Sequence, residues 1–557
     1  MGIVAWAITG AYAGMADIFY KKFVRDTHKA GEVNREVLHT IINANAQTEY
    51  GRRYNFAGIK TAQEYKAQVP LTTYSDYESY IARMVDGATN LLSAEPVKYF
   101  GLSSGTTGKQ KYIPITQRAT RNMNMNMMFL QQGLLGRILP QVKHSGRGLL
   151  LMNMLQTGQT QQGIPTGSGT SGGAQAMKRM FPYFWSSPVA VLQLADQQVA
   201  NYLHLLFALR DKNLGYIGAP FPSSIVQLFS LLEVKWPKLV DYIAHGKVTH
   251  DLELEPNIRQ ELEGKLQPSP KRAAELKREL KRGMQGIALR VWPKMIYVSC
   301  VIGGSFNIYL EKLRYYTADL PIYSAVYGAT EALVGLGDQL DAVSYAVTPR
   351  PAYYEFIPLQ VSDAVNPATC DLDQVQVGES YEVVITNFAG FYRYRLGDVV
   401  KVVGQFNQTP VIEFMYRKGQ LLNLAGEKTP EPAVQYAVQT ALQASQVMAV
   451  DYTVKLNLDA VIGSYCFYLE AGPVGQLNPS VIQRNLEQYL GEANPRYLAG
   501  LKAKRIAPLE LKLVQPGTFQ KIRQELIRRG ASQNQVKVPR LVAAQELIAI
   551  LEENILS

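Results

Sequence analysis

The stretch from Gly101 to Pro114 restricts what this chain can fold into more than any other segment. It reads Gly-Leu-Ser-Ser-Gly-Thr-Thr-Gly-Lys-Gln-Lys-Tyr-Ile-Pro, so glycines, hydroxyls and two lysines precede a short apolar run. Glycines let a backbone approach a ligand closely, hydroxyls donate hydrogen bonds, and Lys109 and Lys111 supply positive charge. The Walker pattern GxxxxGK[ST] does not fit these positions. The stretch predicts a triphosphate-binding loop, and a Ser/Gly-rich surface loop is the alternative.

A second glycine pattern, Gly167 to Gly172, fits the dinucleotide fingerprint GxGxxG literally. That fingerprint requires a strand before it and a helix after it. The preceding run, 156–166, is polar and rich in turn residues. We therefore interpret Gly167 to Gly172 as a loop rather than a dinucleotide site.

The segment from Tyr323 to Glu331 is a short apolar run that ends in a tight turn. Ligands of α/β sheets collect beyond the carboxyl ends of strands, so Thr330 and Glu331 are expected to project into a crevice. There Thr330 can donate to an α-phosphate oxygen, and Glu331 can hold Mg²⁺ between phosphates.

The segment from Gly390 to Val400 carries a carboxylate, Asp398, directly after a glycine. A carboxylate fixed in this way can accept hydrogen bonds from both ribose hydroxyls of a nucleotide. The alternative is a hairpin whose Arg393 and Arg395 pair with surface carboxylates. The residues themselves leave both interpretations open.

The chain has 557 residues, which is more than one hydrophobic core usually serves. We expect an α/β fold, with a large domain at 1–424 and a smaller, mobile α+β domain at 425–557. Strands are predicted at 296–302, 381–386 and 399–403, within a β-rich stretch from Lys294 to Phe414. Beyond a polar hinge, a helix is predicted at 433–445 and strands at 452–456 and 465–470.

The net charge of +11 favours anionic ligands in general, including ATP, nucleic acid and membrane surfaces. The densest basic run, Lys271 to Arg282, is interrupted by Glu275 and Glu279, which lie three residues before arginines and can pair with them. This run therefore predicts a solvated helix face, and we expect no nucleic-acid partner.

Three cysteines lie far apart in the sequence, and the six histidines show no zinc spacing. This pattern favours a reducing compartment, the cytoplasm, and makes any bound metal a hard ion held by oxygens. The apolar start, Met1 to Ala16, is shorter than a membrane span and lacks a charged leader, so we expect no stable membrane insertion. It predicts the first core helix of the large domain, and a weak interfacial membrane contact is the alternative.

Taken in order, the segments at 101–114, 323–331 and 390–400 resemble the phosphate loop, the strand-end Glu motif and the ribose Asp motif of the adenylate-forming superfamily. The finer resemblance is to its auxin-responsive branch, the acyl-acid-amido synthetases that conjugate plant hormones such as jasmonate and indole-acetate to amino acids. The resemblance covers nearly the whole chain. Its further motifs are Thr48 to Gly51, Val69-Pro70, Thr73-Tyr74, Trp292-Pro293, Gly303-Gly304, Gly426 to Thr429, Pro516 to Phe519, Arg529 to Ala531 and Lys537 to Arg540.

The resemblance implies ATP and Mg²⁺ as cofactors, Glu331 as the metal ligand, and Lys428 and Lys537 as catalytic cations, with Lys537 brought in by the small domain. The implied ATP-binding residues are Ser103, Ser104, Gly105, Thr106, Thr107, Lys109, Tyr327, Gly328, Ala329, Thr330, Asp398 and Arg417.

The acyl site is less defined. Arg121 and Met125 lie on a predicted helix after the phosphate loop, within a methionine-rich run that suits an adaptable apolar pocket. The alternative is that this helix belongs to the core and that Arg121 faces solvent.

The predicted function is therefore an ATP-dependent ligase that forms acyl-AMP from a carboxylic acid and conjugates the acyl group to an amino acid. Its partners are these small molecules, and no obligate protein partner is evident. An acyl-CoA ligase and a non-catalytic nucleotide-binding protein are the alternatives.

Overall fold

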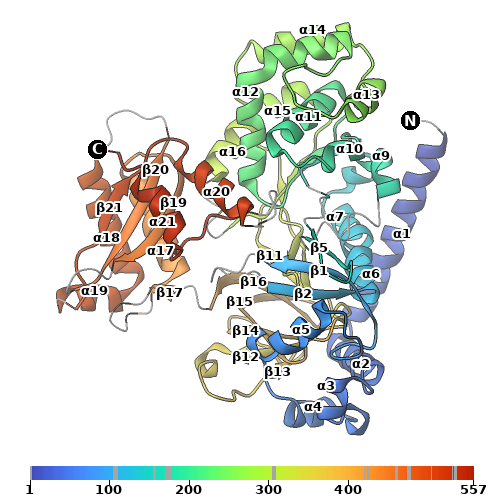
Figure 1. Ribbon diagram of the computed structural model, residues 1–557, viewed down its shortest axis with the longest axis vertical. Coiled ribbons are helices and arrows are strands. Elements are labelled where there is room, and N and C mark those ends of the chain that lie inside the picture. The colour runs from blue at the N-terminus through green and yellow to red at the C-terminus, as the bar shows by residue number, and fades with distance from the viewer. Residues whose placement is uncertain are drawn as a thin grey trace.

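The computed structural model describes residues 3–103, 111–152, 154, 158–167, 169, 178–303, 306, 309–418, 421–422, 424, 427, 429–457, 462–472, 478–503, 505–529, 531 and 536–556. Strands form several sheets, and helices cover them (Figure 1). The elements from α17 onward, orange to red, form a separate body beside the rest. The predicted α/β class with a separate C-terminal domain is confirmed.

The largest sheet is antiparallel and has the strand order β13-β12-β14-β15-β16-β11-β10-β9. Predicted strands 381–386 and 399–403 lie within β14 and β15. The strands are β9 Val326–Gly328, β10 Leu333–Gly337, β11 Ser344–Val347, β12 Tyr353–Pro358, β13 Cys370–Asp371, β14 Ser380–Thr386, β15 Tyr394–Phe406 and β16 Thr409–Arg417.

The N-terminal helices pack their apolar side chains on this sheet in one aromatic core, in which Tyr50 stacks on Tyr392 with ring centroids 4.8 Å apart. These helices are α2 Ala30–Ala44, α3 Glu49–Arg53, η1 Phe56–Gly58, α4 Ala62–Gln68, η2 Tyr74–Asp76 and α5 Glu78–Val85. Beside them lies a four-stranded sheet of order β2-β1-β5-β4, formed by β1 Val97–Ser103, β2 Lys111–Thr116, β4 Gly158–Gln159 and β5 Pro165–Gly167.

A parallel sheet of order β3-β6-β7-β8 forms the centre of a second core. Its strands are β3 Gly148–Leu150, β6 Tyr216–Gly218, β7 Tyr297–Ser299 and β8 Ile322–Tyr323. The strand predicted at 296–302 is β7, which is shorter than predicted. The helices of this region, green in Figure 1, are α11 Gln197–Arg210, α12 Pro222–His245, α13 Pro256–Lys265, α14 Pro270–Leu280, α15 Ile287–Val291 and α16 Leu310–Thr317. Among the described residues, the large part of the chain also has the short helices η4 Pro140–His144, η5 Lys178–Met180, α9 Phe181–Phe184, α10 Val189–Leu192 and η7 Leu359–Val361.

Helix α14 confirms the helix predicted in the basic run. Arg282 pairs with Glu279 at 2.7 Å, as predicted. Glu275 pairs with Lys212 at 2.9 Å instead of with the arginine three residues on, because its carboxylate faces the segment that precedes β6.

The first helix, α1 (Ile3–Thr27), differs from the core helix predicted for its start. Ala16 and Phe23 are buried, but Met15 and Ile18 are 38% and 59% exposed. Helix α1 lies along a second long helical run made of α6 (Gln117–Met125), the π-helical turn η3 (Asn126–Leu130) and α7 (Gln131–Ile138). No helix in the described part of the chain is long and apolar enough to cross a membrane.

The C-terminal body consists of the sheet β19-β20-β21 and its helices. The helix predicted at 433–445 is α17, and the two predicted strands are β19 and β20. The elements are β17 Leu421–Leu422, β18 Thr429–Pro430, α17 Glu431–Ala444, β19 Ala449–Asn457, β20 Ser464–Ala471, α18 Pro479–Ala493, α19 Pro495–Lys502, β21 Glu510–Leu513, α20 Thr518–Arg528 and α21 Gln545–Glu552. Their core begins with Leu422. The boundary between 424 and 425 stays a prediction.

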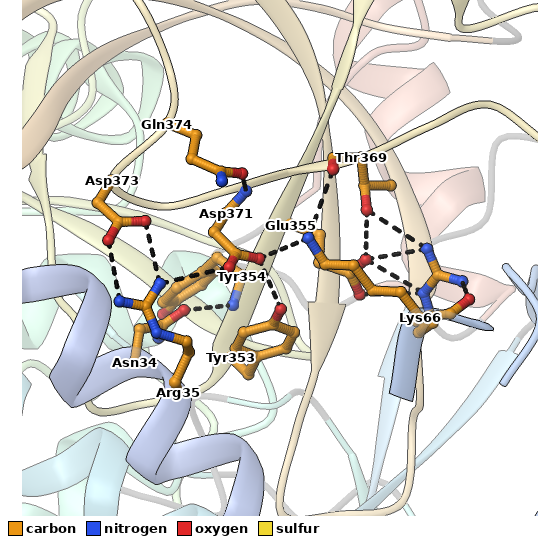
Figure 2. Close-up of polar contacts among 11 residues, drawn as sticks. Asn34, Arg35, Lys66, Tyr353, Tyr354, Glu355, Thr369, Asp371, Asp373 and Gln374 are labelled. Carbon is orange, nitrogen blue, oxygen red and sulfur yellow. Dashed lines mark hydrogen bonds and ion pairs between the residues drawn. The ribbon is translucent and has the colours of Figure 1, made fainter. Parts of the chain in front are cut away.

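Buried carboxylates on β13 and β12, at one edge of the large sheet, pair with cations from other segments. Figure 2 shows Asp371 of β13 between Lys66 of α4, at 2.5 Å, and Arg35 of α2, at 3.4 Å. Glu355, on the neighbouring strand β12, pairs with Arg393 at 2.9 Å, and the pair is almost fully buried.

Arg393 and Arg395 therefore do not pair with surface carboxylates, as the hairpin alternative supposed. Arg395 pairs with Glu382, which is 2% exposed, at 2.6 Å. Arg393 adopts a φ of 47°, a strained value for a residue with a side chain, and its buried pairing holds it there. Both arginines anchor the segment that leads to Asp398.

Candidate active site

A cavity of about 2150 Å³ opens between the sheets and the C-terminal body. It lies at the carboxyl ends of β6 and β7, where ligands of parallel sheets collect. It is also lined by the turn between β9 and β10, by helix α6 and by residues 536–544 of the C-terminal body. Side chains from both bodies of the protein therefore reach one space.

The segment 329–332 forms a tight turn in which the amide of Ala329 donates to the carbonyl of Ala332 at 2.8 Å. This turn joins β9 to β10 at the edge of the antiparallel sheet, whereas the sequence suggested the end of a strand in an α/β sheet. Its side chains still face the cavity. A Cβ added at Gly101, near the end of β1, would lie 2.5 Å from Cγ2 of Thr330. The end of β1 thus approaches this turn closely.

Asp398 lies in a bulge of β15. On β14, Glu382 and Val384 are two residues apart, while their partners on β15, Val399 and Arg395, are four residues apart. Bulges of this kind re-aim side chains and are frequent beside active sites. The bulge places the Asp398 carboxylate at the cavity wall.

Two neighbours hold this carboxylate. The hydroxyl of Tyr327, on β9, donates to Oδ2 of Asp398 at 2.9 Å, and Nε of Arg417, at the end of β16, donates to Oδ1 at 2.6 Å. Burial lowers the pKa of Arg417, but its contacts with Asp398 and the nearby charge of Glu331 together outweigh this effect, so the pKa of Arg417 lies above its usual value. A carboxylate has about four lone-pair sites, so Asp398 keeps capacity for further donors.

Glu331 faces the same cavity, where the hydroxyl of Tyr394 lies 3.4 Å from its Oε1. Burial raises the pKa of Glu331, and the charge of Arg417 opposes this shift. The carboxylate is therefore under-compensated, and a bound cation would favour its charged form. Among the described residues, no three His, Cys, Asp or Glu side chains form a cluster that could hold a metal. A metal here would need phosphate oxygens or water as further ligands.

Lys537 reaches the cavity from the C-terminal body because the segment around it is attached to β19. The amide of Val454 donates to the carbonyl of Arg540 at 2.9 Å, and the amide of Val542 donates to the carbonyl of Val454 at 2.8 Å. These two hydrogen bonds form an isolated parallel β-bridge between Val454 and Leu541, which attaches the segment to β19 and leaves Lys537 lining the cavity.

There the ammonium of Lys537 lies 4.8 Å from the ring centre of Phe221 and 5.0 Å from that of Phe306. The two rings stack at 5.0 Å, so a cation sits over a paired aromatic surface. Burial lowers the pKa of Lys537, and the charge of Arg417 adds to this effect. The lysine side chain is exposed to the cavity that it lines.

The structure brings most of the predicted site residues that it describes to one cavity: Tyr327, Gly328, Ala329, Thr330, Glu331, Asp398, Arg417 and Lys537 all line it. Arg121 and Met125 line it as well, on the wall formed by α6. Ser103 ends β1, where it pairs with Lys111 of β2. Ser104, Gly105, Thr106, Thr107, Lys109 and Lys428 lie outside the described residues, as does most of the Gly167 to Gly172 segment.

Sequence reasoning missed other residues of this cavity. Tyr394 lies in the same motif as Asp398 but carries no pattern of its own. Phe221 follows β6 and caps the start of α12, where a Pro-Phe-Pro run is the single local signal. Tyr12 of α1 lines the cavity although the sequence predicted only a core helix there.

Comparisons with known proteins give a consistent pattern. The chain matches the GH3 family N-terminal domain over residues 19–322, the central domain over 345–417 and the C-terminal domain over 432–546. It is 33% identical to jasmonoyl-L-amino acid synthetase JAR4 of Nicotiana attenuata, over 95% of this chain and 94% of that protein. It is 30% identical to indole-3-acetic acid-amido synthetase GH3.10 of Arabidopsis thaliana, over 96% of each.

Solved structures show the same relationship. The AtGH3.15 acyl acid amido synthetase in complex with 2,4-DB matches with a TM-score of 0.87 at 30% identity, over 96% of each chain. A 2-hydroxyisobutyryl-CoA ligase bound to an acyl-AMP matches with a TM-score of 0.55 at 10% identity, over 93% of this chain and 90% of that one. This second likeness concerns the fold alone.

Proposed function

The chain belongs to the GH3 family, and on that premise we propose that it is an ATP-dependent acyl-acid-amido synthetase. It activates a carboxylic acid as acyl-AMP with release of pyrophosphate and passes the acyl group to the amino group of an amino acid. One observation carries the proposal. Asp398, Arg417 and Glu331 of the large sheet and Lys537 of the C-terminal body line the same cavity.

In the first step, a carboxylate oxygen of the acid attacks the α-phosphorus of ATP, and the bond to pyrophosphate breaks. Negative charge grows on the transferred and leaving phosphates. Cations placed beforehand stabilise such charge without reorganising during the reaction. Lys537 and Arg417 take this role.

Asp398 positions the nucleoside by accepting the ribose hydroxyls, while Tyr327 and Arg417 hold its carboxylate in place. The segment 327–330 contacts adenine and the α-phosphate. The glycine-rich loop, with Ser103, Ser104, Gly105, Thr106, Thr107 and Lys109, holds the remaining phosphates.

Mg²⁺ would supply positive charge that neutralises the phosphates, and Glu331 is the residue that would hold it. The half-buried carboxylate of Glu331, whose pKa burial raises, fits a cation ligand. Glu331 carries a negative charge at the metal position only while it is deprotonated.

In the second step, the amine attacks the carbonyl carbon of acyl-AMP, the amide bond forms, and AMP leaves. We propose that the C-terminal domain, with its boundary near residue 425, moves between the two steps to admit the amine. In the sequence, Lys428 follows this proposed boundary by a few residues. The three described cysteines are free thiols, which supports the cytoplasm as the compartment.

The test is an assay of pyrophosphate and AMP release with Mg-ATP and a panel of aryl, indolyl and fatty acids. The panel is run alone, with mixed amino acids, and with CoA. Acid-dependent pyrophosphate release that is accelerated by amino acids supports the proposal. Acceleration by CoA alone would reassign the chain as an acyl-CoA ligase, and ATP binding without release from any acid would favour a non-catalytic role.

A further inference from the structure

The helix that carries the methionine-rich wall of the cavity is interrupted by a π turn. Within the run α6-η3-α7, the amide of Gln131 donates to the carbonyl of Asn126, five residues back, instead of four. Such turns are rare and are frequent at functional sites, because they widen the helix and redirect neighbouring side chains. Met125, Met127 and Met128 beside this turn all line the cavity.

A side chain distant in the sequence holds this turn. The hydroxyl of Tyr12, on α1, donates to the carbonyl of Met128 at 2.9 Å. The Tyr12 ring lies 5.5 Å from that of Phe129, in the same turn, and 4.5 Å from that of Phe184, on another wall of the cavity. Burial raises the pKa of Tyr12, so its hydroxyl stays a donor at ordinary pH.

Helix α1 does not depend on Tyr12 for its position. A Cβ added at Gly133 of α7 would lie 2.5 Å from the carbonyl oxygen of Ala16, so the two helices are in close contact one turn further along. Asp17 also pairs with Arg137 of α7. Removing the Tyr12 hydroxyl should therefore leave α1 in place and change only the turn.

Three aromatic side chains form another part of the cavity wall. Nε1 of Trp185 donates to the hydroxyl of Tyr216 at 3.0 Å, and Tyr216 stacks on Tyr297 at 4.9 Å. All three side chains line the cavity. A cavity lined by both flat rigid rings and flexible methionines suits a bulky apolar group.

We propose that Tyr12 is a positioning residue for acyl selection: its hydroxyl holds the π turn and thereby shapes this end of the cavity for a bulky apolar acid. The inference rests on the proposed function, in which the cavity takes an acid. If the turn relaxed to a regular α-helix, residues on one side of it would rotate by about 100° relative to the other. The methionines would then present a different surface to the acyl group.

The test compares wild type with Tyr12→Phe, which keeps the ring and removes the hydroxyl. Tyr20→Phe is the matched control, because Tyr20 lies on the same helix, packs against Arg137 of α7 and does not line the cavity. Binding of 4-phenylbutanoate and of propanoate is measured by calorimetry without ATP. The KM and kcat for both acids are then measured by pyrophosphate release.

We expect Tyr12→Phe to weaken binding of 4-phenylbutanoate and raise its KM about fivefold, as the loss of one part-buried hydrogen bond between neutral groups does. In Tyr12→Phe, the binding and KM of propanoate, the KM for ATP and kcat should change little. Tyr20→Phe should match wild type in all of these values. Equal binding of 4-phenylbutanoate by wild type and Tyr12→Phe would overturn the inference, as would a wild type that does not bind it. If 4-phenylbutanoate bound but no pyrophosphate were released, this would count against the proposed function. The ratio of its affinities for wild type and Tyr12→Phe would still decide the role of Tyr12.

Discussion

The hydroxyl of Tyr309 lies 2.7 Å from Oδ2 of Asp451, and this hydrogen bond joins the N-terminal family domain to the C-terminal one. Asp451 is 1% exposed and also pairs with Arg523 and Arg540, each at 2.6 Å. Arg540 lies three residues after Lys537. The same cluster therefore fixes the contact between the domains and the segment that carries the lysine.

Replacement of Tyr309 by Phe should slow acyl-adenylate formation about 10- to 100-fold, because hydrogen bonds to charged groups contribute roughly 1.5 to 3 kcal/mol. The bond acts across the domain contact, so its loss favours arrangements in which Lys537 is away from the cavity. Single-turnover pyrophosphate release measures the effect. Tyr315→Phe, an exposed tyrosine of α16, is the control. An unchanged rate in Tyr309→Phe would show that this bond does not limit adenylation.

Replacement of Lys537 by Ala should lower kcat for adenylation about 10² to 10³-fold, the usual cost of removing one preplaced group that stabilises transition-state charge. ATP affinity should change little, because a group acting mainly in the transition state contributes little to ground-state binding. Calorimetry and pyrophosphate release measure the two quantities. Lys502→Ala, at the exposed end of α19, is the control. Parallel losses of affinity and rate would assign Lys537 to ATP binding instead.

The pH dependence should follow from the same lysine. Burial and the charge of Arg417 lower the pKa of Lys537. Because only the protonated amine stabilises negative charge, adenylation should decline as the pH rises through this lowered pKa, below the value near 10.4 of an ordinary lysine. In Lys537→Arg the guanidinium stays charged, so the remaining activity should lose this alkaline decline. Single-turnover rates between about pH 6 and pH 10 measure both profiles, and identical declines would exclude Lys537 as their source.

The sequence was most informative where a ligand imposes residue types on a short segment. The segment 327–331 and Asp398 could be selected from the sequence because glycine, hydroxyl and carboxylate neighbours are uncommon together, and both line the cavity. The fold class followed from strand and helix patterns, and predicted strands such as 381–386 match closely. The boundaries of β7 were less accurate, because apolar residues beyond a strand are also buried.

Contacts made only in three dimensions could not be predicted. The approach of Lys537 to Phe221 joins residues more than 300 positions apart, and neither carries a local signal for the other. The buried pairing of Arg393 with Glu355 depends on the order of strands in the sheet. The exposure of Met15 and Ile18 could not be predicted either. The sequence of an apolar helix does not show whether other elements pack over it.

Replacement of Glu331 by Gln should raise the Mg²⁺ concentration needed for half-maximal pyrophosphate release, because an amide binds a hard cation less strongly than a carboxylate. In the wild type, this Mg²⁺ concentration should also rise as the pH is lowered. Since burial raises the pKa of Glu331, its carboxylate is protonated at a higher pH than an ordinary glutamate. Mg²⁺ titrations at several pH values measure both effects, with exposed Glu311→Gln as the control. An unchanged titration in Glu331→Gln would remove this residue from the metal site.

Asp398 should determine how the enzyme distinguishes ribose from deoxyribose. Its carboxylate is fixed by Tyr327 and Arg417, so it can accept both ribose hydroxyls without reorientation. Replacement by Asn keeps the shape but weakens these hydrogen bonds, since bonds to a charged acceptor are roughly twice as strong as neutral ones. We expect wild type to prefer ATP over 2′-deoxy-ATP in kcat/KM, and Asp398→Asn to narrow this preference about tenfold.

Tyr327→Phe supplies the graded comparison, because it removes one of the two donors that hold the carboxylate and leaves the charge in place. It should reduce the preference for ATP by less than Asp398→Asn does. If Asp398→Asn lowered kcat/KM for both nucleotides by the same factor, the carboxylate would serve to neutralise Arg417 rather than to bind ribose. The ratio between the nucleotides, not the loss of activity, therefore decides between the two roles.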